Sequence, residues 1–384
     1  MNKPDYRDWN LVNLISSIKW FCWIESKSYP YLKELTPEYL SAYRNVVLFL
    51  IDWLGYEWIN KYAQWSFLHS KMRGKLKTIF PTTTSSAITT INTWLTPSEH
   101  SVLWWNMYCK EAGSIIKILP WEHKILWVTL GTNLKISDIV DKKPFYQDCK
   151  NEAVLIFSDE HKEWEYNSFY TVWATKLPHS WFESFFDKVS QILNFDMEKR
   201  YIFAYWSEFD SISHDKWNDS LEVKKHYDEI DEAFRKLYEK NWWKDTLFIV
   251  TADHWQTIVR DENKIDMRSV HPKLCEMLVM PMAWEPRFQY CFVKEWRKED
   301  FERYVKSNLQ DICILISKEE ALESSLFWEW KDERFLERIW DYILMPKPWY
   351  AIFDEPIWKR VKSDIWYHWW LTPDELNIPL IVME

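Results

Sequence analysis

Short apolar runs alternate with amphipathic segments along most of the chain. The runs at residues 45–51, 201–205 and 246–251 are almost entirely apolar, which is typical of strands buried on both faces of a parallel sheet. Further strands are predicted at residues 125–130, 153–157 and 376–382.

Helices are predicted where apolar residues recur three and four positions apart and charged residues occupy the outer face. They fall at residues 8–25, 85–95, 179–195 and 221–240. The last of these lies between the strands at 201–205 and 246–251, which makes a strand–helix–strand unit. This alternation predicts an α/β fold with a mostly parallel central sheet that is covered by helices on both faces.

The pattern changes after residue 254. A strand is predicted at residues 287–294, a helix at 298–309 and another strand at 312–317. We therefore expect a single large domain over residues 1–384, with a small α/β subdomain inserted at residues 285–335. A chain of 384 residues is long enough to bury the core of such a domain.

Glycine is scarce and tryptophan abundant, with 4 Gly against 29 Trp. At ordinary usage of about 7%, a chain of this length would hold roughly 27 glycines. Tight turns need glycine because they place residues at positive φ. Trp53, Trp94 and Trp255 stand at expected turns, and tryptophans are also scattered through polar stretches. We hypothesise that most of the tryptophans are UGA codons that the source organism reads as glycine, whereas Trp105 and Trp206 lie in aromatic or apolar contexts typical of genuine tryptophan.

Charge and cysteine usage narrow the class of protein. The net charge of −10 argues against a general nucleic-acid binder. The six cysteines are dispersed and form no C-x-x-C pair, as expected of reduced thiols in a cytoplasmic protein. The first 20 residues lack the pattern of a signal peptide, and no stretch approaches the roughly 20 apolar residues that span a membrane. We expect a cytoplasmic protein without a membrane span. The sequence does not indicate its oligomeric state.

Carboxyl and imidazole side chains stand just after two of the central apolar runs. Asp52 follows the run at 45–51, and Asp253 and His254 follow the run at 246–251. Ligands of open α/β sheets bind beyond the carboxyl ends of the strands, so these residues can meet there. Each also has a structural explanation, since Asp52 could cap a helix and Asp253 could cap one beside a core histidine.

Four further side chains are candidates for the same place. Asp210 and His214 are four residues apart, so one helical turn would put both on one face, although surface ion pairs share this spacing. Thr84 stands directly before a predicted helix, where it could approach a bound phosphate or simply cap the helix. His368 alone is typical of a solvated loop. Acidic and imidazole ligands around a hydroxyl suit divalent-metal phosphate chemistry.

Five segments, in order, resemble the alkaline phosphatase superfamily, and in particular its type I phosphodiesterase/nucleotide pyrophosphatase family. They are VVLFLIDWLG (46–55), FPTTTSSAITTINTWLTPSEH (80–100), YIFAYWSEFDSISH (201–214), LFIVTADHWQ (247–256) and YHWWLTPDELNIPLIV (367–382). The match improves when glycine is placed at Trp53, Trp94, Trp255, Trp369 and Trp370. The resemblance spans residues 45 to 382 and implies a three-layer α/β/α sandwich.

The resemblance also implies a set of site residues. Asp210, His214 and His368 would hold one divalent metal, and Asp52, Asp253 and His254 would hold a second. Both metals are expected to be zinc, while the ligand types also tolerate manganese or magnesium. Thr84 would be the nucleophile and touch the second metal. It is chosen over Thr82 and Thr83 because it comes third after Pro81, immediately before the helix. Asn106 matches a position near the phosphate oxygens.

The activity implied is hydrolysis of a small phosphate ester by a phosphodiesterase or nucleotide pyrophosphatase, through a covalent phosphothreonine. The segment after Thr84 lacks the pattern of a sulfatase, and a threonine nucleophile argues against a phosphoglycerate mutase. A phosphomonoesterase on the same scaffold remains an alternative. So does a catalytically silent phosphate-binding protein, if the tryptophans beside the ligands are genuine. Nothing in the sequence names the natural substrate.

Overall fold

The computed structural model describes residues 5–25, 28–126, 128–130, 134–195, 198–241, 245–324, 326–329, 332–354, 366–367 and 373–384. For residues 214, 215, 257, 258, 284, 366, 367, 373 and 374 it describes the backbone only. None of the helices within these ranges is long and apolar enough to cross a membrane.

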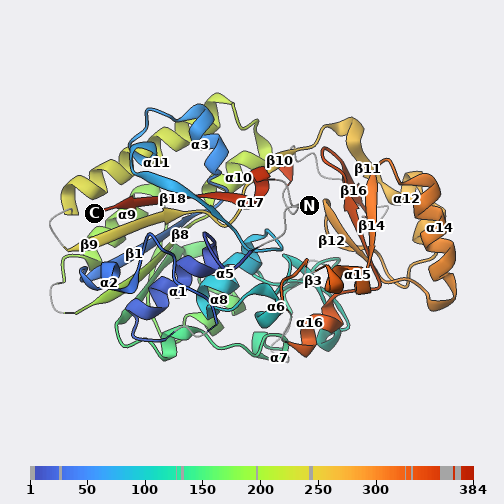
Figure 1. The fold of residues 1–384 in the computed structure, drawn as a ribbon, viewed down its shortest axis with the longest axis horizontal. Coiled ribbons are helices and arrows are strands. Elements are labelled where there is room, and N and C mark those ends of the chain that lie inside the picture. The colour runs from blue at the N-terminus through green and yellow to red at the C-terminus, as the bar shows by residue number, and fades with distance from the viewer. Residues whose placement is uncertain are drawn as a thin grey trace.

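A seven-stranded sheet forms the centre of the larger part of the molecule (Figure 1). Its strand order is β2-β18-β9-β1-β8-β6-β7. The parallel strands are β1 (Asn45–Ile51), β6 (Glu152–Ser158), β7 (Thr175–His179), β8 (Arg200–Trp206) and β9 (Thr246–Thr251). The last strand, β18 (Asn377–Met383), runs antiparallel to both β9 and β2 (Met72–Lys77). The sheet is therefore mostly parallel, as predicted.

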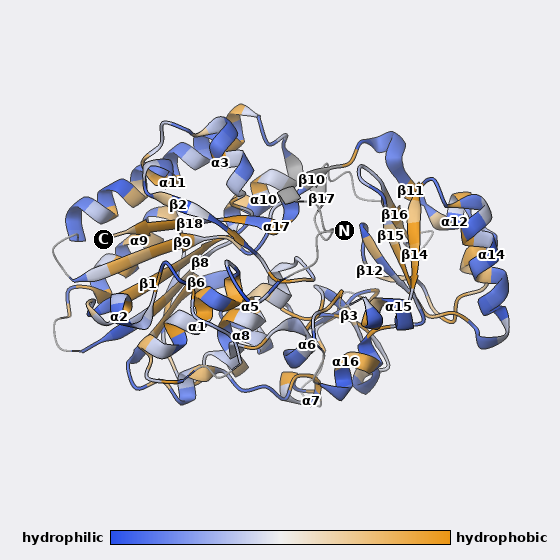
Figure 2. Cartoon of the chain, viewed as in Figure 1, coloured by the Kyte–Doolittle hydropathy of each residue, from blue (hydrophilic) through white to orange (hydrophobic). Residues whose placement is uncertain are grey.

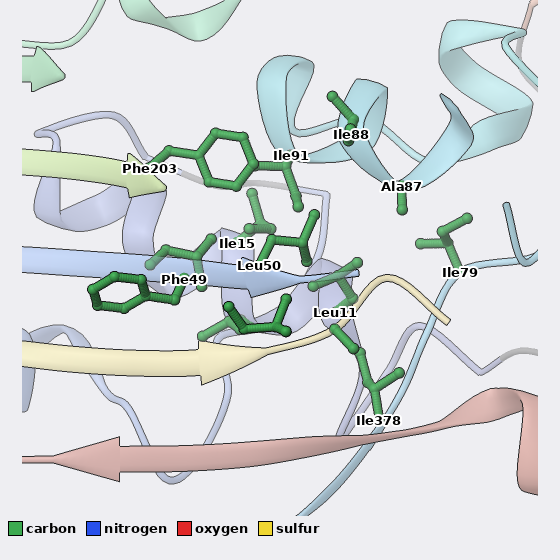
Figure 3. Close-up of a cluster of buried hydrophobic side chains, with 14 of the residues drawn as sticks. Leu11, Ile15, Phe49, Leu50, Ile79, Ala87, Ile88, Ile91, Phe203 and Ile378 are labelled. Carbon is green, nitrogen blue, oxygen red and sulfur yellow. The ribbon is translucent and has the colours of Figure 1, made fainter. Parts of the chain in front are cut away.

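Helices cover both faces of this sheet. Phe49 and Leu50 of β1 point to opposite faces because side chains alternate along a strand. Phe49 packs against Phe185 of α9 (Phe182–Ile192) and Phe234 of α11 (Leu221–Asn241), with ring centroids 6.0 and 4.8 Å apart. Figure 3 shows Leu50 among side chains of α1 (Leu11–Phe21) and α5 (Thr84–Thr93). Figure 2 shows the same division, with apolar strands inside and hydrophilic faces on the outer helices.

A smaller antiparallel sheet lies at the other end of the molecule (Figure 1). Its order is β12 (Ala283–Glu285), β13 (Phe288–Cys291), β15 (Tyr342–Pro346) and β14 (Cys313–Ser317), and α14 (Lys298–Asn308) packs beside it. Phe301 and Leu344 belong to a separate hydrophobic core in this part. The sheet extends beyond both bounds of the predicted insertion at 285–335, and the division into domain and subdomain remains a proposal.

The remaining elements connect and flank these two sheets. The helices are α2 (Pro37–Ser41), α3 (Tyr56–Tyr62), α4 (Phe67–Ser70), α6 (Pro97–His100), α7 (Ile136–Ile139), α8 (Glu165–Tyr170), α10 (Glu208–Asp215), α12 (Met267–Val270), α13 (Pro272–Cys275), α15 (Lys318–Glu323), α16 (Glu333–Arg338) and α17 (Pro373–Leu376). The strands are β3 (Asn106–Cys109), β4 (Ser114–Lys117), β5 (Glu122–His123), β10 (Thr257–Ile258), β11 (Lys264–Asp266), β16 (Ala351–Phe353) and β17 (Trp366–Tyr367).

Four of the predicted elements differ from the structure. The helix predicted at residues 8–25 is shorter, at Leu11–Phe21, and the strand predicted at residues 287–294 is shorter, at Phe288–Cys291. The prediction of a strand at residues 125–130 is wrong for the residues of this range that the structure describes: residues 124–126 form a turn, and Thr129 makes only an isolated bridge with Glu122. The helix predicted at residues 179–195 begins later, at Phe182, because His179 ends β7. Strand β7 was missed because its sequence, TKLPH, contains a proline and lacks the apolar run of a buried strand. Its residues are partly exposed in the structure.

Seven tryptophans have the left-handed backbone conformation that favours glycine. Among the described residues, nine residues other than glycine have positive φ, and seven of these are tryptophan. They are Trp9, Trp23, Trp53, Trp94, Trp121, Trp328 and Trp349. This conformation costs an ordinary residue roughly 1–2 kcal/mol. Seven such residues would therefore lower the free energy of unfolding by about 7–14 kcal/mol. That penalty is as large as the whole stability of a typical protein, about 5–15 kcal/mol.

His100 joins α6 to α5 in the core. Its Nε2 lies 3.1 Å from Thr90 Oγ1, and its Nδ1 accepts a hydrogen bond of 3.0 Å from the Val102 N–H. The side chain is buried, and burial lowers the pKa of His100 to about 3. The neutral imidazole is therefore the form that holds these two segments together.

We expect the free energy of unfolding to fall as the pH drops from about 6.5 to 3, because unfolded His100 binds a proton in this window and folded His100 does not. The contribution is at most about 1.4 kcal/mol per pH unit. Denaturant unfolding of the metal-free protein at several pH values, compared with His100→Gln, measures it. If the free energy of unfolding changed equally with pH in both proteins, His100 would not be the source of this pH dependence.

Candidate metal centre and phosphate site

Asp52, Asp253 and His254 meet at the carboxyl edge of the large sheet. Ile51 pairs with Trp206 across β1 and β8, and Leu50 pairs with Thr251 across β1 and β9, so the three strands end together. One ligand atom from each of the three residues lies within 4.8 Å of the others. His254 Nε2 is 3.2 Å from Asp253 Oδ2 and 3.6 Å from Asp52 Oδ1. The three side chains are buried.

This cluster concentrates negative charge away from water. Burial raises the pKa of Asp52 well above its usual range, and the nearby carboxylates of Asp253 and Asp210 raise it further. Asp52 Oδ1 and Asp253 Oδ2 are buried and accept no hydrogen bond from the part of the chain that the structure describes. Two free carboxylate oxygens beside an imidazole nitrogen fit a divalent cation, which would offset the repulsion.

Thr84 opens helix α5 beside this cluster. Its Oγ1 lies 3.1 Å from His254 Nε2. The preceding residue, Thr83, is the N-cap of α5, but its side chain makes no capping hydrogen bond. Thr84 is thus the threonine of the Thr82–Thr84 run whose hydroxyl is placed against a candidate metal ligand. The first turn of a helix also leaves backbone N–H groups without intrahelical partners, and these attract anions.

The second predicted ligand set is described only in part. Asp210 and His214 are four residues apart on α10, about one helical turn. Asp210 Oδ1 accepts a hydrogen bond of 2.6 Å from Gln256 Nε2, two residues after His254. The side chain of His214 and all of His368 lie outside what the structure describes. Strand β17 ends one residue before His368, and it pairs with β10 and contacts α10.

Asn106 begins strand β3 and contacts the small sheet. Its Nδ2 donates a hydrogen bond of 3.0 Å to Glu285 Oε1 at the end of β12. Glu285 is buried, so its carboxylate holds the amide of Asn106 in one orientation. Two residues further on, buried Arg287 forms an ion pair with buried Glu375, 3.2 Å apart, which anchors β13 to α17.

Two residues of this site carry no role in the sequence-based prediction. Tyr205 donates a hydrogen bond of 2.5 Å to Asp52 Oδ2, and Gln256 orients Asp210. Burial raises the pKa of Tyr205 well above its usual range, which keeps it protonated as a donor. Tyr205 interrupts the apolar run of β8 just before its end, and this polar hydroxyl was a usable signal. Gln256 gave none, because its contact depends on the turn after His254.

The mostly parallel central sheet with helices on both faces is the fold of the alkaline phosphatase superfamily. The model of the type I phosphodiesterase/nucleotide pyrophosphatase family matches residues 46–368. The chain therefore belongs to this family, whose members typically depend on divalent metals.

Solved structures share the fold at low sequence identity. Murine ectonucleotide pyrophosphatase/phosphodiesterase 5 is 17% identical, with a TM-score of 0.64 over 87% of each chain. An inactive variant of that protein, solved in complex with AMP, gives a TM-score of 0.63 at 16% identity over 87% of each chain. Phosphonoacetate hydrolase from Sinorhizobium meliloti 1021, in complex with phosphonoacetate, gives 0.63 at 12% identity, over 88% of this chain and 89% of the hydrolase. No curated protein sequence matches the chain.

Replacing Tyr205 with phenylalanine should weaken divalent-metal binding by roughly tenfold or more, because the hydrogen bond that orients Asp52 is lost. Tyr201→Phe is a matched control on the same strand. The Tyr201 hydroxyl is buried and has no hydrogen-bond partner among the described residues. Titration with zinc or manganese, followed by calorimetry, measures both variants. Equal affinities for the two would remove Tyr205 from the metal site.

Proposed function

We propose that this protein is a two-metal phosphodiesterase or nucleotide pyrophosphatase that acts through a covalent phosphothreonine at Thr84. The observation that carries the proposal is the distance of 3.1 Å between Thr84 Oγ1 and His254 Nε2, within the buried cluster of Asp52 and Asp253. A hydroxyl against candidate metal ligands, at a helix start that attracts anions, is arranged for attack on phosphorus.

Asp52, Asp253 and His254 would hold one metal, and Asp210, His214 and His368 the other. We favour zinc, and manganese and magnesium also suit these donors. When bound, divalent cations at these residues would lower the pKa of the Thr84 hydroxyl and neutralise charge on the phosphoryl oxygens.

Thr84 Oγ1 would attack phosphorus as the bond from phosphorus to the leaving oxygen breaks. The Thr84 proton passes to solvent, and the leaving oxygen takes a proton from water. Water then attacks phosphorus of this threonine ester, the bond from phosphorus to Thr84 Oγ1 breaks, and the phosphate monoester is released as the Thr84 hydroxyl is restored. Negative charge that develops on the phosphoryl oxygens would be stabilised by the N–H groups at the start of α5 and by the amide of Asn106.

A cleft that includes Tyr205, the residue that donates a hydrogen bond to Asp52, supports a diester over a monoester as the substrate. It is lined mainly by apolar and aromatic side chains, which include Ile88, Phe157 and Tyr205. Ile88 lies one helical turn after Thr84, and the Tyr205 hydroxyl donates a hydrogen bond to Asp52. A diester keeps an organic group on phosphorus after the leaving group departs, and such a surface can bind that retained group, whereas a monoester keeps only the phosphate.

Thr84→Ala should lower the hydrolysis of bis(p-nitrophenyl) phosphate by a factor on the order of 10⁴ or more, because the nucleophile is lost. Thr83→Ala is the matched control: its buried hydroxyl has no hydrogen-bond partner among the described residues, and the variant should keep its activity. Parallel assays with p-nitrophenyl phosphate, each with added zinc or manganese, test the diester preference. Diester cleavage by Thr84→Ala at the full rate would rule out this nucleophile, and failure of the metal-loaded protein to cleave either ester would favour a silent phosphate-binding protein.

Glu285→Leu should lower kcat for the diester about tenfold, because the Asn106 amide loses its orienting acceptor. Asn106→Ala alone should lower it by roughly 10²-fold or more. The decisive comparison is the double variant, in which Glu285→Leu should have no further effect once the amide is gone. Additive losses would show that Glu285 supports the fold and does not position Asn106.

A further inference from the structure

The turn at Trp94 has the geometry of a glycine turn. Trp94 is the C-cap residue of α5, with φ 60° and ψ 23°, and its N–H bonds the Thr90 carbonyl. Helices commonly end in this way, and glycine is the usual residue because a Cβ is strained there. The ring of Trp94 is stacked on Phe145 at a centroid distance of 3.4 Å, closer than the usual aromatic separation of about 4.5–7 Å.

The turn after Asp52 has the same character at the candidate metal centre. Trp53 has φ 70°, and its N–H lies 3.3 Å from Asp253 Oδ1, so this left-handed turn sets the distance between two candidate ligands. The ring of Trp53 is buried and stacks on Trp255 at 4.2 Å. The ring of Trp255 also lies against Gly55, where a Cβ would be only 2.3 Å from the Trp255 ring. Two large side chains therefore crowd the loops that carry Asp52 and His254.

Other tryptophans are largely exposed to solvent. Trp65 is 99% exposed, and Trp296 is 79% exposed. Trp23 and Trp349 are both exposed and left-handed. Backbone conformation, crowding and exposure are three separate properties, and each points to a small residue.

We propose that glycine occupies Trp9, Trp23, Trp53, Trp94, Trp121, Trp255, Trp328 and Trp349 in the protein that its source organism makes, because ribosomes there read UGA as glycine. The first consequence is structural: the left-handed turns lose their strain. The second concerns the candidate metal centre. Glycine at 53 and 255 removes the two stacked rings, and the turn after Asp52, in which the N–H of residue 53 contacts Asp253, keeps a conformation that glycine adopts freely. The functional form of the protein is then the glycine form.

Genuine tryptophans provide the control. Trp206 lies in β8, is buried, and its ring packs against Phe182 and Phe185 at centroid distances of 5.3 and 5.2 Å. Its Nε1 donates to His226 Nε2 at 3.4 Å. A residue with ordinary strand geometry and this many aromatic neighbours is expected to be tryptophan in the natural protein.

The first test reads the natural protein and its gene. We expect UGA at the eight positions and UGG at Trp206, and peptide masses from the source organism that carry glycine at the eight and tryptophan at 206. UGG codons at positions 53 and 94, or peptides with tryptophan there, would overturn the proposal. This test needs neither a folded recombinant protein nor any enzymatic activity, so it is independent of the proposed function.

The second test compares two recombinant proteins, one with tryptophan at the eight positions and one with Trp→Gly at all eight. The glycine form should unfold cooperatively with the higher Tm and bind zinc or manganese more tightly. Added singly to the tryptophan form, Trp94→Gly should raise Tm, whereas Trp206→Gly in the glycine form should lower it. A lower Tm and weaker metal binding in the glycine form than in the tryptophan form would contradict the assignment.

Discussion

The repulsion between buried carboxylates at the end of the sheet is the interaction on which the site depends. Asp52 and Asp253 are desolvated side by side, and Asp210 adds to the same field. Charges placed in this way are stable only when a cation, a proton or hydrogen-bond donors compensate them. Tyr205 and the Trp53 N–H supply two donors, and one oxygen of each buried carboxylate is left to bind a cation.

The sheet supplies the rigidity that such a cluster requires. β1 lies between β8 and β9 in parallel register, so the residues that follow the three strands emerge at one edge without long loops. Aromatic packing of Phe49 against α9 and α11 holds β1 on one face of the sheet. Helix α5 is held from its far end by His100, which places Thr84 at its near end against His254. Core packing and site geometry are thus parts of one arrangement.

The central strands and the first ligands could be predicted from the sequence because both depend on local patterns. The continuous apolar runs of β1, β8 and β9 indicate strands that are buried in a parallel sheet. The polar residues that follow them must then lie at the carboxyl edge of that sheet. The contacts that link distant segments gave no such pattern. The bond from Asn106 to Glu285 joins strands of two different sheets, and Gln256 reaches Asp210 only through the turn after His254. Strand β7 was missed because it is half exposed and so lacks a continuous apolar run.

The composition and the backbone constrain each other at this site. A turn that reverses directly after a strand end needs a left-handed residue, and position 53 has one. If that residue carries an indole, the ring must be buried between the loops of Asp52 and His254, where it meets a second ring at 255. Glycine at both positions satisfies the same turn with no buried ring. The backbone that brings the candidate ligands together is therefore compatible with every side chain in the cluster, and the tryptophans are the residues in conflict with it.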